Sequence, residues 1–140
     1  MDIISVILCL RNKLIYTVVN SVIGVVMSRF RAHVLVCDVV RDDGIHCGNK
    51  GGIEVRKKLI KTLSDKDLNL DVKVTSVGCT SQHRACDVDQ CSMIVYGLND
   101  EGVWYRVSPD DIDLFVEEHL IKGNRVDHLI NDEIKVDFNS

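Results

Sequence analysis

SVGCTSQHRACDVDQCSMIVYGLNDEGVWYRVSPDD, the stretch from Ser76 to Asp111, decides the fold. It contains two β-rich runs, and the segment GLNDEG between them is typical of a hairpin loop. Five cysteines form two groups, each after a β-like segment: Cys37 and Cys47 upstream, and Cys79, Cys86 and Cys91 within the stretch. This grouping predicts one site, built by loops at one edge of a small sheet.

A helix is predicted directly after the hairpin, whose strands we place at 92–96 and 103–107. Ser108 suits the cap position, Pro109 suits the first helical position, and the acids that follow complement the helix dipole. Gly123 is expected to end this helix. One face of it is apolar at helical spacing: Ile112, Phe115, Val116, His119 and Leu120.

Upstream of the quoted stretch, the pattern predicts two strands with a helix between them. Residues 32–37 form a short apolar run and residues 71–77 are rich in β-branched side chains, so both suit strands. Residues 53–67 show helical spacing, with one apolar face: Val55, Leu59, Leu63 and, beside them, Ile60. The order β-α-β-β-β-α predicts an α/β sandwich of the thioredoxin-like kind, with a small mixed sheet and two helices.

A chain of 140 residues suits one domain with tails. We expect an apolar extension at 1–27 outside the fold, one folded domain at 28–130 and a C-terminal tail at 131–140. The formal net charge of −4 provides no overall basic field. Nucleic acid is therefore not an expected partner.

The N-terminal extension is apolar, but Arg11 and Lys13 interrupt it. Its longest uncharged run, 14–28, has 15 residues, whereas a membrane-spanning helix needs about 20. We therefore do not expect membrane association, and a membrane anchor is the alternative for this segment. Cys9 lies in the extension and is excluded from the site. Without a recognisable export signal, a cytoplasmic protein is expected, and clustered cysteines favour metal or redox chemistry over disulfides.

The cysteine spacing narrows the chemistry of the site. Strand ends in a parallel β-α-β unit lie at the same edge, so Cys37 and Cys79 are expected to be neighbours. Four thiolates suit tetrahedral zinc or an iron–sulfur cluster. The intervals C-x9-C and C-x6-C-x4-C lack the C-x2-C knuckles of most structural zinc sites, which favours iron–sulfur. A zinc module is the alternative, and a thiol–disulfide protein is the weakest interpretation because C-x-x-C is absent.

Several segments together resemble one family over residues 31–130. These are HVLVC, CGNKGG, VTSVGC and the run MIVYGLNDEGVWYRVSPDDIDLFVEEHLIKGNRVDHLI, within which EGVWY leads into a proline-started helix. They are similar to the thioredoxin-like [2Fe-2S] ferredoxins. The resemblance implies an electron carrier rather than an enzyme, with one [2Fe-2S] cluster, a redox partner protein and a homodimeric state. It also allows a role as a subunit of a larger oxidoreductase.

The resemblance assigns cluster ligands to positions of this sequence. Cys37 and Cys47 match the first two ligands of the family, and Cys79 in Gly78-Cys79 matches the third. The family places its fourth cysteine a few residues after the third, where this chain has His83 and a longer loop. Counting back from Tyr96 brings Cys86 into register, so Cys86 is the predicted fourth ligand. Cys91 is the second choice and His83 the third.

We predict that residues 1–27 are dispensable, because their longest uncharged run is too short to span a bilayer. A chain beginning at Met27 should fold and bind its cofactor with the same iron content as the full chain. The measurement is iron and sulfide analysis of both purified proteins. Carbonate-resistant membrane association that depends on these residues would contradict the prediction.

Overall fold

The computed structural model describes residues 30–82, 90–98 and 100–131, which form a four-stranded mixed sheet of order β2-β1-β3-β4. The edge strand β2 runs parallel to β1, and β3 runs antiparallel to both β1 and β4. The strands are β1 (Ala32–Cys37), β2 (Val72–Val77), β3 (Cys91–Gly97) and β4 (Asp100–Val107).

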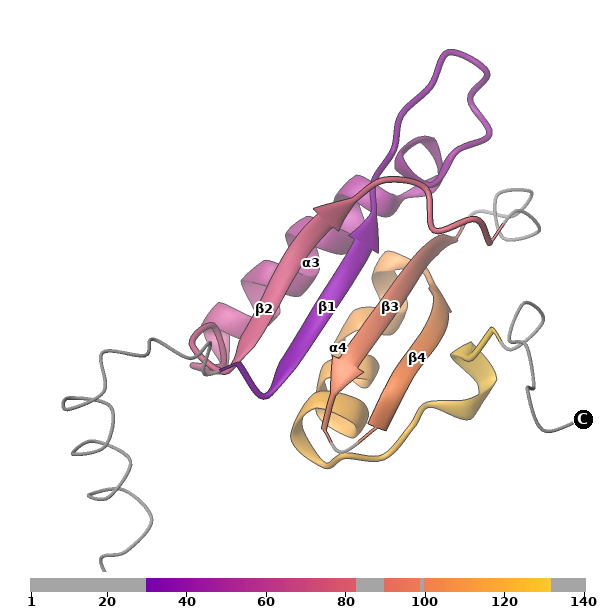
Figure 1. The fold of residues 1–140 in the computed structure, drawn as a ribbon. Coiled ribbons are helices and arrows are strands. Elements are labelled where there is room, and N and C mark those ends of the chain that lie inside the picture. The colour runs from indigo at the N-terminus through magenta and orange to yellow at the C-terminus, as the bar shows by residue number, and fades with distance from the viewer. Residues whose placement is uncertain (1–29, 83–89, 99, 132–140) are drawn as a thin grey trace, which may run out of the picture.

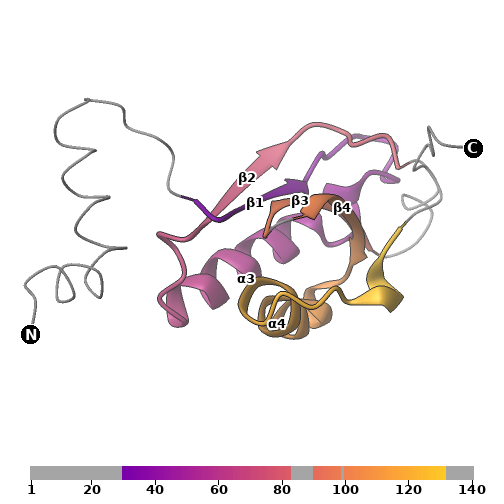
Figure 2. The same cartoon turned by 60° about the horizontal axis from the view of Figure 1, so that its bottom comes forward.

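Two helices complete the fold. Helix α3 spans Gly52–Asp65 and follows a 3-10 turn, η1, at Cys47–Lys50. The second helix starts as a 3-10 turn at Pro109–Asp111, continues as α4 (Ile112–Phe115) and ends as the π-helical turn η4 (Val116–Ile121). Both helices lie on the same face of the sheet (Figures 1 and 2). The predicted β-α-β-β-β-α order, mixed sheet and two-layer sandwich are therefore confirmed.

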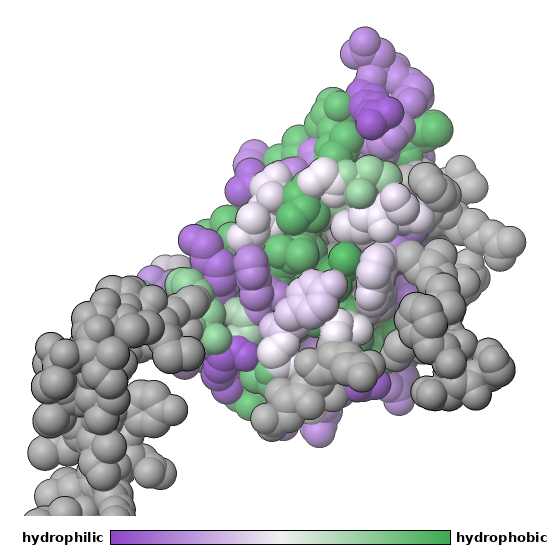
Figure 3. Space-filling view, viewed as in Figure 1, coloured by the Kyte–Doolittle hydropathy of each residue, from purple (hydrophilic) through white to green (hydrophobic). Residues whose placement is uncertain are grey.

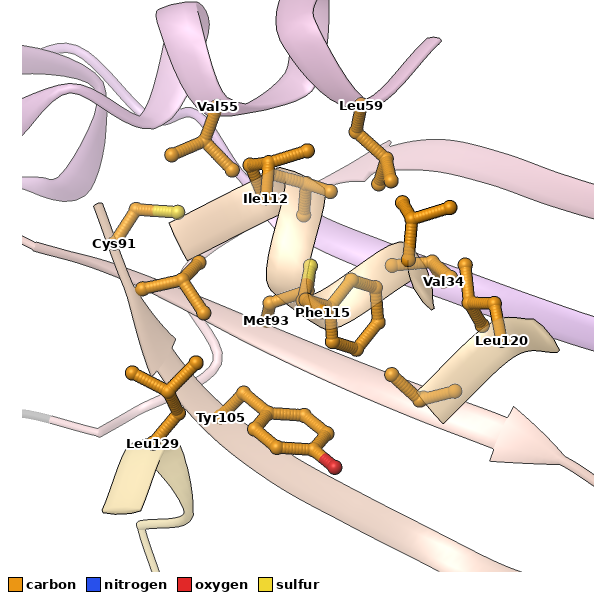
Figure 4. Packing of buried hydrophobic residues seen from close by; sticks show 14 of the residues in the cluster. Val34, Val55, Leu59, Cys91, Met93, Tyr105, Ile112, Phe115, Leu120 and Leu129 are labelled. Carbon is orange, nitrogen blue, oxygen red and sulfur yellow. The ribbon is translucent and has the colours of Figure 1, made fainter. Parts of the chain in front are cut away.

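The core fills the space between the helices and the sheet (Figure 4). Strand β1, predicted as a short apolar run, alternates between the two faces of the sheet, with Val34 and Val36 fully buried and Leu35 turned to the other face. From the helices, the predicted apolar faces supply Val55, Leu59, Leu63, Ile112, Phe115, Val116 and Leu120, all at most 2% exposed. Each such side chain stabilises the fold by roughly 1.5–3 kcal/mol relative to leaving it in water.

The start of the second helix forms as its sequence predicts. Ser108 and Asp111 make a reciprocal capping box, in which the Ser108 backbone N–H donates to Asp111 Oδ2 at 2.7 Å. Farther along, His119 is 1% exposed and its Nδ1 lies 2.8 Å from the Tyr105 hydroxyl. His119 is thus part of the core, as its place on the apolar face indicates.

Two details differ from the sequence expectation. Ile60 was assigned to the apolar face of α3, yet it is 45% exposed. It lies beside the strip of α3 that packs against the sheet and not within that strip. The predicted hairpin loop GLNDEG is much shorter in the structure: β3 extends to Gly97, β4 begins at Asp100, and these two residues pair. A positive φ of 109° at Gly97 accommodates the irregular register there.

The face of the sheet opposite the helices carries a row of apolar side chains (Figure 3). Leu35 pairs with Ile94, and Ile94 pairs with Trp104, so the three lie side by side across β1, β3 and β4. Beside them, the Tyr96 side chain lies over Gly102, where an added Cβ would come 2.6 Å from the tyrosine ring. Tyr96 is 46% exposed. This open face is defined here as Leu35, Tyr96 and Trp104 around Ile94, which is itself only 6% exposed.

Residues 1–29, 83–89, 99 and 132–140 lie outside the described part of the chain. The predicted domain limits at residues 28 and 130 therefore stay predictions. Among the helices of residues 30–82, 90–98 and 100–131, none has the length and apolar character needed to cross a membrane.

The junction between β1 and α3 is closely packed. An added Cβ at Gly52, the first residue of α3, would lie 2.5 Å from the Cys37 carbonyl oxygen and 2.7 Å from that of Cys47. Gly48 is similarly confined, and its backbone N–H donates to the Val39 carbonyl at 2.8 Å. Only a residue without a side chain lets α3, η1 and the end of β1 meet at this distance.

We predict that Gly52→Ala lowers the free energy of unfolding by about 1–3 kcal/mol, because the methyl group forces backbone atoms apart. A loss of stability would point to this steric conflict, because replacing glycine by alanine in a helix ordinarily increases stability. Urea denaturation of the apoprotein measures the effect. Gly78→Ala is the matched control: an added Cβ there meets nothing within 4 Å, so its change should stay within about 0.5 kcal/mol. Equal stabilities of the two variants would contradict the prediction.

Candidate metal centre

Four of the predicted or alternative site residues gather at one end of the sheet. Cys37 is the last residue of β1 and pairs with Val77, the last residue of β2. Cys79 follows two residues later, Cys47 begins η1, and Cys91 begins β3 at the same end, since β1 and β3 are antiparallel. The loop that joins Cys37 to η1 projects beyond this end of the sheet (Figure 1). The elements that carry these four cysteines thus meet at one end of the sheet, and their role as ligands stays a prediction.

Cys37 and Cys47 form a buried pair of thiols, 1% and 2% exposed. A hydrogen bond from the Cys47 side chain is the main reason why the pKa of Cys37 falls to about 6. Burial opposes this shift, and hydrogen bonds from the backbone N–H groups of Val39 and Thr80 support it. The thiolate is the form of cysteine that binds metals. This pair is therefore suited to be two ligands of a metal centre.

Cys79 differs from this pair because it is exposed to solvent. The Ser81 backbone N–H lies 3.4 Å from its sulfur. Across the described ranges, no three His, Cys, Asp or Glu side chains are gathered closely enough to hold a metal ion. The other two candidates for the fourth ligand, Cys86 and His83, lie outside those ranges.

Cys91 sits in the hydrophobic core with no exposed surface. Burial raises the pKa of its thiol far above the ordinary value, and the negative charges of Cys37 and Asp38 add to the shift. Alternation along β3 turns the side chain toward Met93 and Val95, which are also buried. In this placement Cys91 behaves as a small apolar core residue.

An ion pair beside Cys37 was not predicted from the sequence. Asp38 follows Cys37 directly, and its carboxylate accepts from Arg56 Nε at 2.7 Å and from the Ser76 hydroxyl at 2.5 Å. These contacts tie the end of β1 to α3 and β2. The negative charge of Asp38 raises the pKa of Cys37. The positive charge of Arg56, paired with Asp38, partly offsets that charge. A separation of 18 residues with no periodic pattern explains why the sequence shows no sign of the pair.

The donors fit an iron–sulfur group in chemistry. Cys37 and Cys47 are soft sulfur ligands in contact, with one of them already biased toward thiolate. Backbone N–H groups aimed at a sulfur are the arrangement that stabilises negative charge on such ligands. Cys79 adds a third thiol at the same end of the sheet. The described residues thus supply one assembled pair of thiols and a third thiol on an element that ends at the same end of the sheet.

Comparison with known proteins gives a consistent picture. No family model matches the chain. A protein described as "Ferredoxin, 2Fe-2S" from Aquifex aeolicus is 33% identical over 109 residues, which cover 74% of this chain and 91% of the relative.

Solved structures agree with this relative. The crystal structure of the wild-type thioredoxin-like [2Fe-2S] ferredoxin from Aquifex aeolicus superposes with a TM-score of 0.62 at 31% identity, over 72% of this chain and 96% of the other. A cysteine-to-serine variant of that ferredoxin gives 0.61 at 31% identity, over 71% and 96%. Sequence and fold therefore match along nearly the whole length of these proteins. This chain belongs to the thioredoxin-like [2Fe-2S] ferredoxin family, as the resemblance of its sequence implied.

Proposed function

We propose that this protein is an electron carrier with one [2Fe-2S] cluster at the end of the sheet where β1 and β2 finish. The observation that carries the proposal is the buried Cys37–Cys47 pair, held at the strand end of a chain that belongs to a ferredoxin family. When bound, such a cluster takes up and releases one electron at a time. No site for a substrate is needed, because the reaction is the exchange of electrons with another protein.

The proposed ligands are Cys37, Cys47, Cys79 and Cys86. Burial of the first two excludes water, and backbone N–H groups directed at Cys37 favour added negative charge. For the fourth position we keep Cys86 over Cys91, because a thiol in the core would have to leave its apolar surroundings to reach a cluster. The zinc module is not favoured, since the relatives that match are named as [2Fe-2S] ferredoxins.

A ferredoxin implies a redox partner protein, and we further propose that the chain forms a homodimer. The open face of the sheet supports this proposal, because Leu35, Ile94 and Trp104 form an apolar row that no described helix covers. A second copy would cover the half-buried side chains of Leu35 and Trp104 and the exposed Tyr96 ring, whereas Ile94 between them is already only 6% exposed. A cytoplasmic location is also part of the proposal, since a reducing compartment keeps such cysteines available as ligands.

We predict that alanine at any of Cys37, Cys47, Cys79 or Cys86 largely abolishes cluster assembly, because each change removes one of four thiolate ligands. The measurement combines the visible absorption spectrum with iron and sulfide content. Wild-type protein should be red-brown, whereas a zinc protein is colourless. A Cys79→Ala protein that keeps wild-type iron and sulfide would refute the ligand set.

Cys91→Ala and His83→Ala are the controls for the fourth ligand, and both should keep most of the cluster. Cys91→Ala removes only the sulfur of a core side chain, so its main effect should be on stability. A weakened cluster in Cys86→Ala that disappears when Cys91 is also replaced would mean that Cys91 substitutes for the lost ligand. The assignment fails if Cys86→Ala leaves spectrum and iron content unchanged while Cys91→Ala removes them.

For the homodimer, we predict that Trp104→Glu shifts the protein to monomers, because it places a charge in the middle of the apolar row. Sedimentation equilibrium measures the change, which should be at least about tenfold in the dimer dissociation constant. Leu114→Glu on α4 is the matched control: Leu114 is 44% exposed in the helical layer, and its replacement should leave the dimer intact. A monomeric wild-type protein, or equal dissociation of both variants, would contradict the proposed interface.

A further inference from the structure

The segment that follows Cys79 is held on the sheet by a buried polar network. Gln82 is only 2% exposed, and its Nε2 donates to the Ser92 hydroxyl oxygen on β3 at 2.5 Å. The Oε1 atom of Gln82 accepts from Asn131 Nδ2, also at 2.5 Å. Ser92 and Asn131 are 1% and 4% exposed. Both ends of the Gln82 amide are therefore occupied by buried partners.

The network is anchored to two strands of the sheet. Ser92 belongs to β3, and Asn131 is fixed to β4 because its backbone N–H donates to the Trp104 carbonyl at 2.8 Å. Asn131 follows the short turn η5 (Asp127–Leu129), and Ile130 makes an isolated bridge with Tyr105. The position of Gln82 is thus set by the sheet and the C-terminal segment.

Thr80 extends this network toward the proposed ligand Cys79. Its hydroxyl hydrogen-bonds to the Ser92 hydroxyl, so it joins the same buried group of side chains. Ser81 lies between Thr80 and Gln82, and its backbone N–H donates to the Cys79 sulfur at 3.4 Å. Both neighbours of this N–H group are therefore held by the network.

Stability alone gives little reason for this arrangement. Replacing a buried hydrogen-bonded pair by apolar groups of the same shape is often close to neutral, whereas losing one partner is costly. Buried networks of this kind do, however, hold a segment in a single conformation. The segment held here begins directly after the proposed ligand Cys79 and carries the Ser81 N–H group that donates to the Cys79 sulfur.

We propose that Gln82 is a positioning residue of the cluster: together with Ser92 and Thr80 it holds the Ser81 N–H on the sulfur of Cys79, and it thereby raises the reduction potential. The inference rests on the proposed function. The sign follows from charge: reduction adds one electron to the cluster and its sulfur ligands, and an N–H donor stabilises the more negative state. Loosening the contact of the Ser81 N–H with Cys79 should lower the reduction potential without removing a ligand.

The test uses the purified holoprotein and two near-isosteric variants, Gln82→Leu and Thr80→Val. Gln82→Leu removes both hydrogen bonds of the amide, and Thr80→Val removes the hydroxyl that links Thr80 to Ser92 while keeping its backbone N–H. Potentiometric titration monitored by visible absorption gives the reduction potential. At a fixed ambient potential, the ratio of reduced to oxidised protein should fall roughly threefold to tenfold in both variants. For a one-electron couple this corresponds to a shift of about 30–60 mV to lower potential.

Gln90→Ala is the matched control, because Gln90 is the same residue type in the same connection and is only half-buried. Its potential should equal that of the wild type. Iron content and thermal unfolding accompany each titration, and if Gln82→Leu does not fold, Thr80→Val decides. Unchanged potentials in cluster-containing variants, or an equal shift in Gln90→Ala, would overturn the inference and leave the proposed function standing. A wild-type protein without iron and sulfide would instead refute the proposed function itself, and the inference with it.

Discussion

The close approach of Gly52 to the carbonyl oxygens of Cys37 and Cys47 is the constraint on which the site depends. It brings the first residue of α3 against the end of β1 and against η1 in one place. Because no side chain fits between these backbones, the two cysteines have little freedom to separate. The packing of α3 against the end of β1 thereby keeps the thiols of Cys37 and Cys47 close together.

The electrostatic surroundings then distinguish cysteines that are equally buried. Cys91 lies in the apolar core near the negative charges of Cys37 and Asp38, and burial raises the pKa of its thiol. Cys37 is just as inaccessible, yet donors from Cys47 and from two backbone N–H groups lower the pKa of its thiol. Hydrogen bonding outweighs desolvation at Cys37 because several donors point at one sulfur. The same donors favour a sulfur ligand that carries negative charge, which suits a site of electron transfer.

Much of the fold could be predicted because its signals are local and periodic. The apolar faces around Leu59 and Phe115 follow helical spacing, and Ser108 carries its capping partner three residues along the chain. Ile60 was assigned wrongly, because spacing alone does not show how wide a strip of α3 the sheet covers. The hairpin was predicted in the right place but with too long a loop, since residues such as Asp100 that favour turns were drawn into strand pairing.

For the site, the sequence by itself determined that Cys37 and Cys79 follow strands and that Cys47 precedes the first helix, and the rule for parallel strands brings the two strand ends to one edge. Only the tertiary structure decided what surrounds the sulfurs. The Asp38–Arg56 pair joins residues 18 apart, and Gln82 meets Asn131 across 49 residues. Such contacts produce no periodic pattern in the sequence, because they depend on how separate elements pack and not on the conformation of any one element.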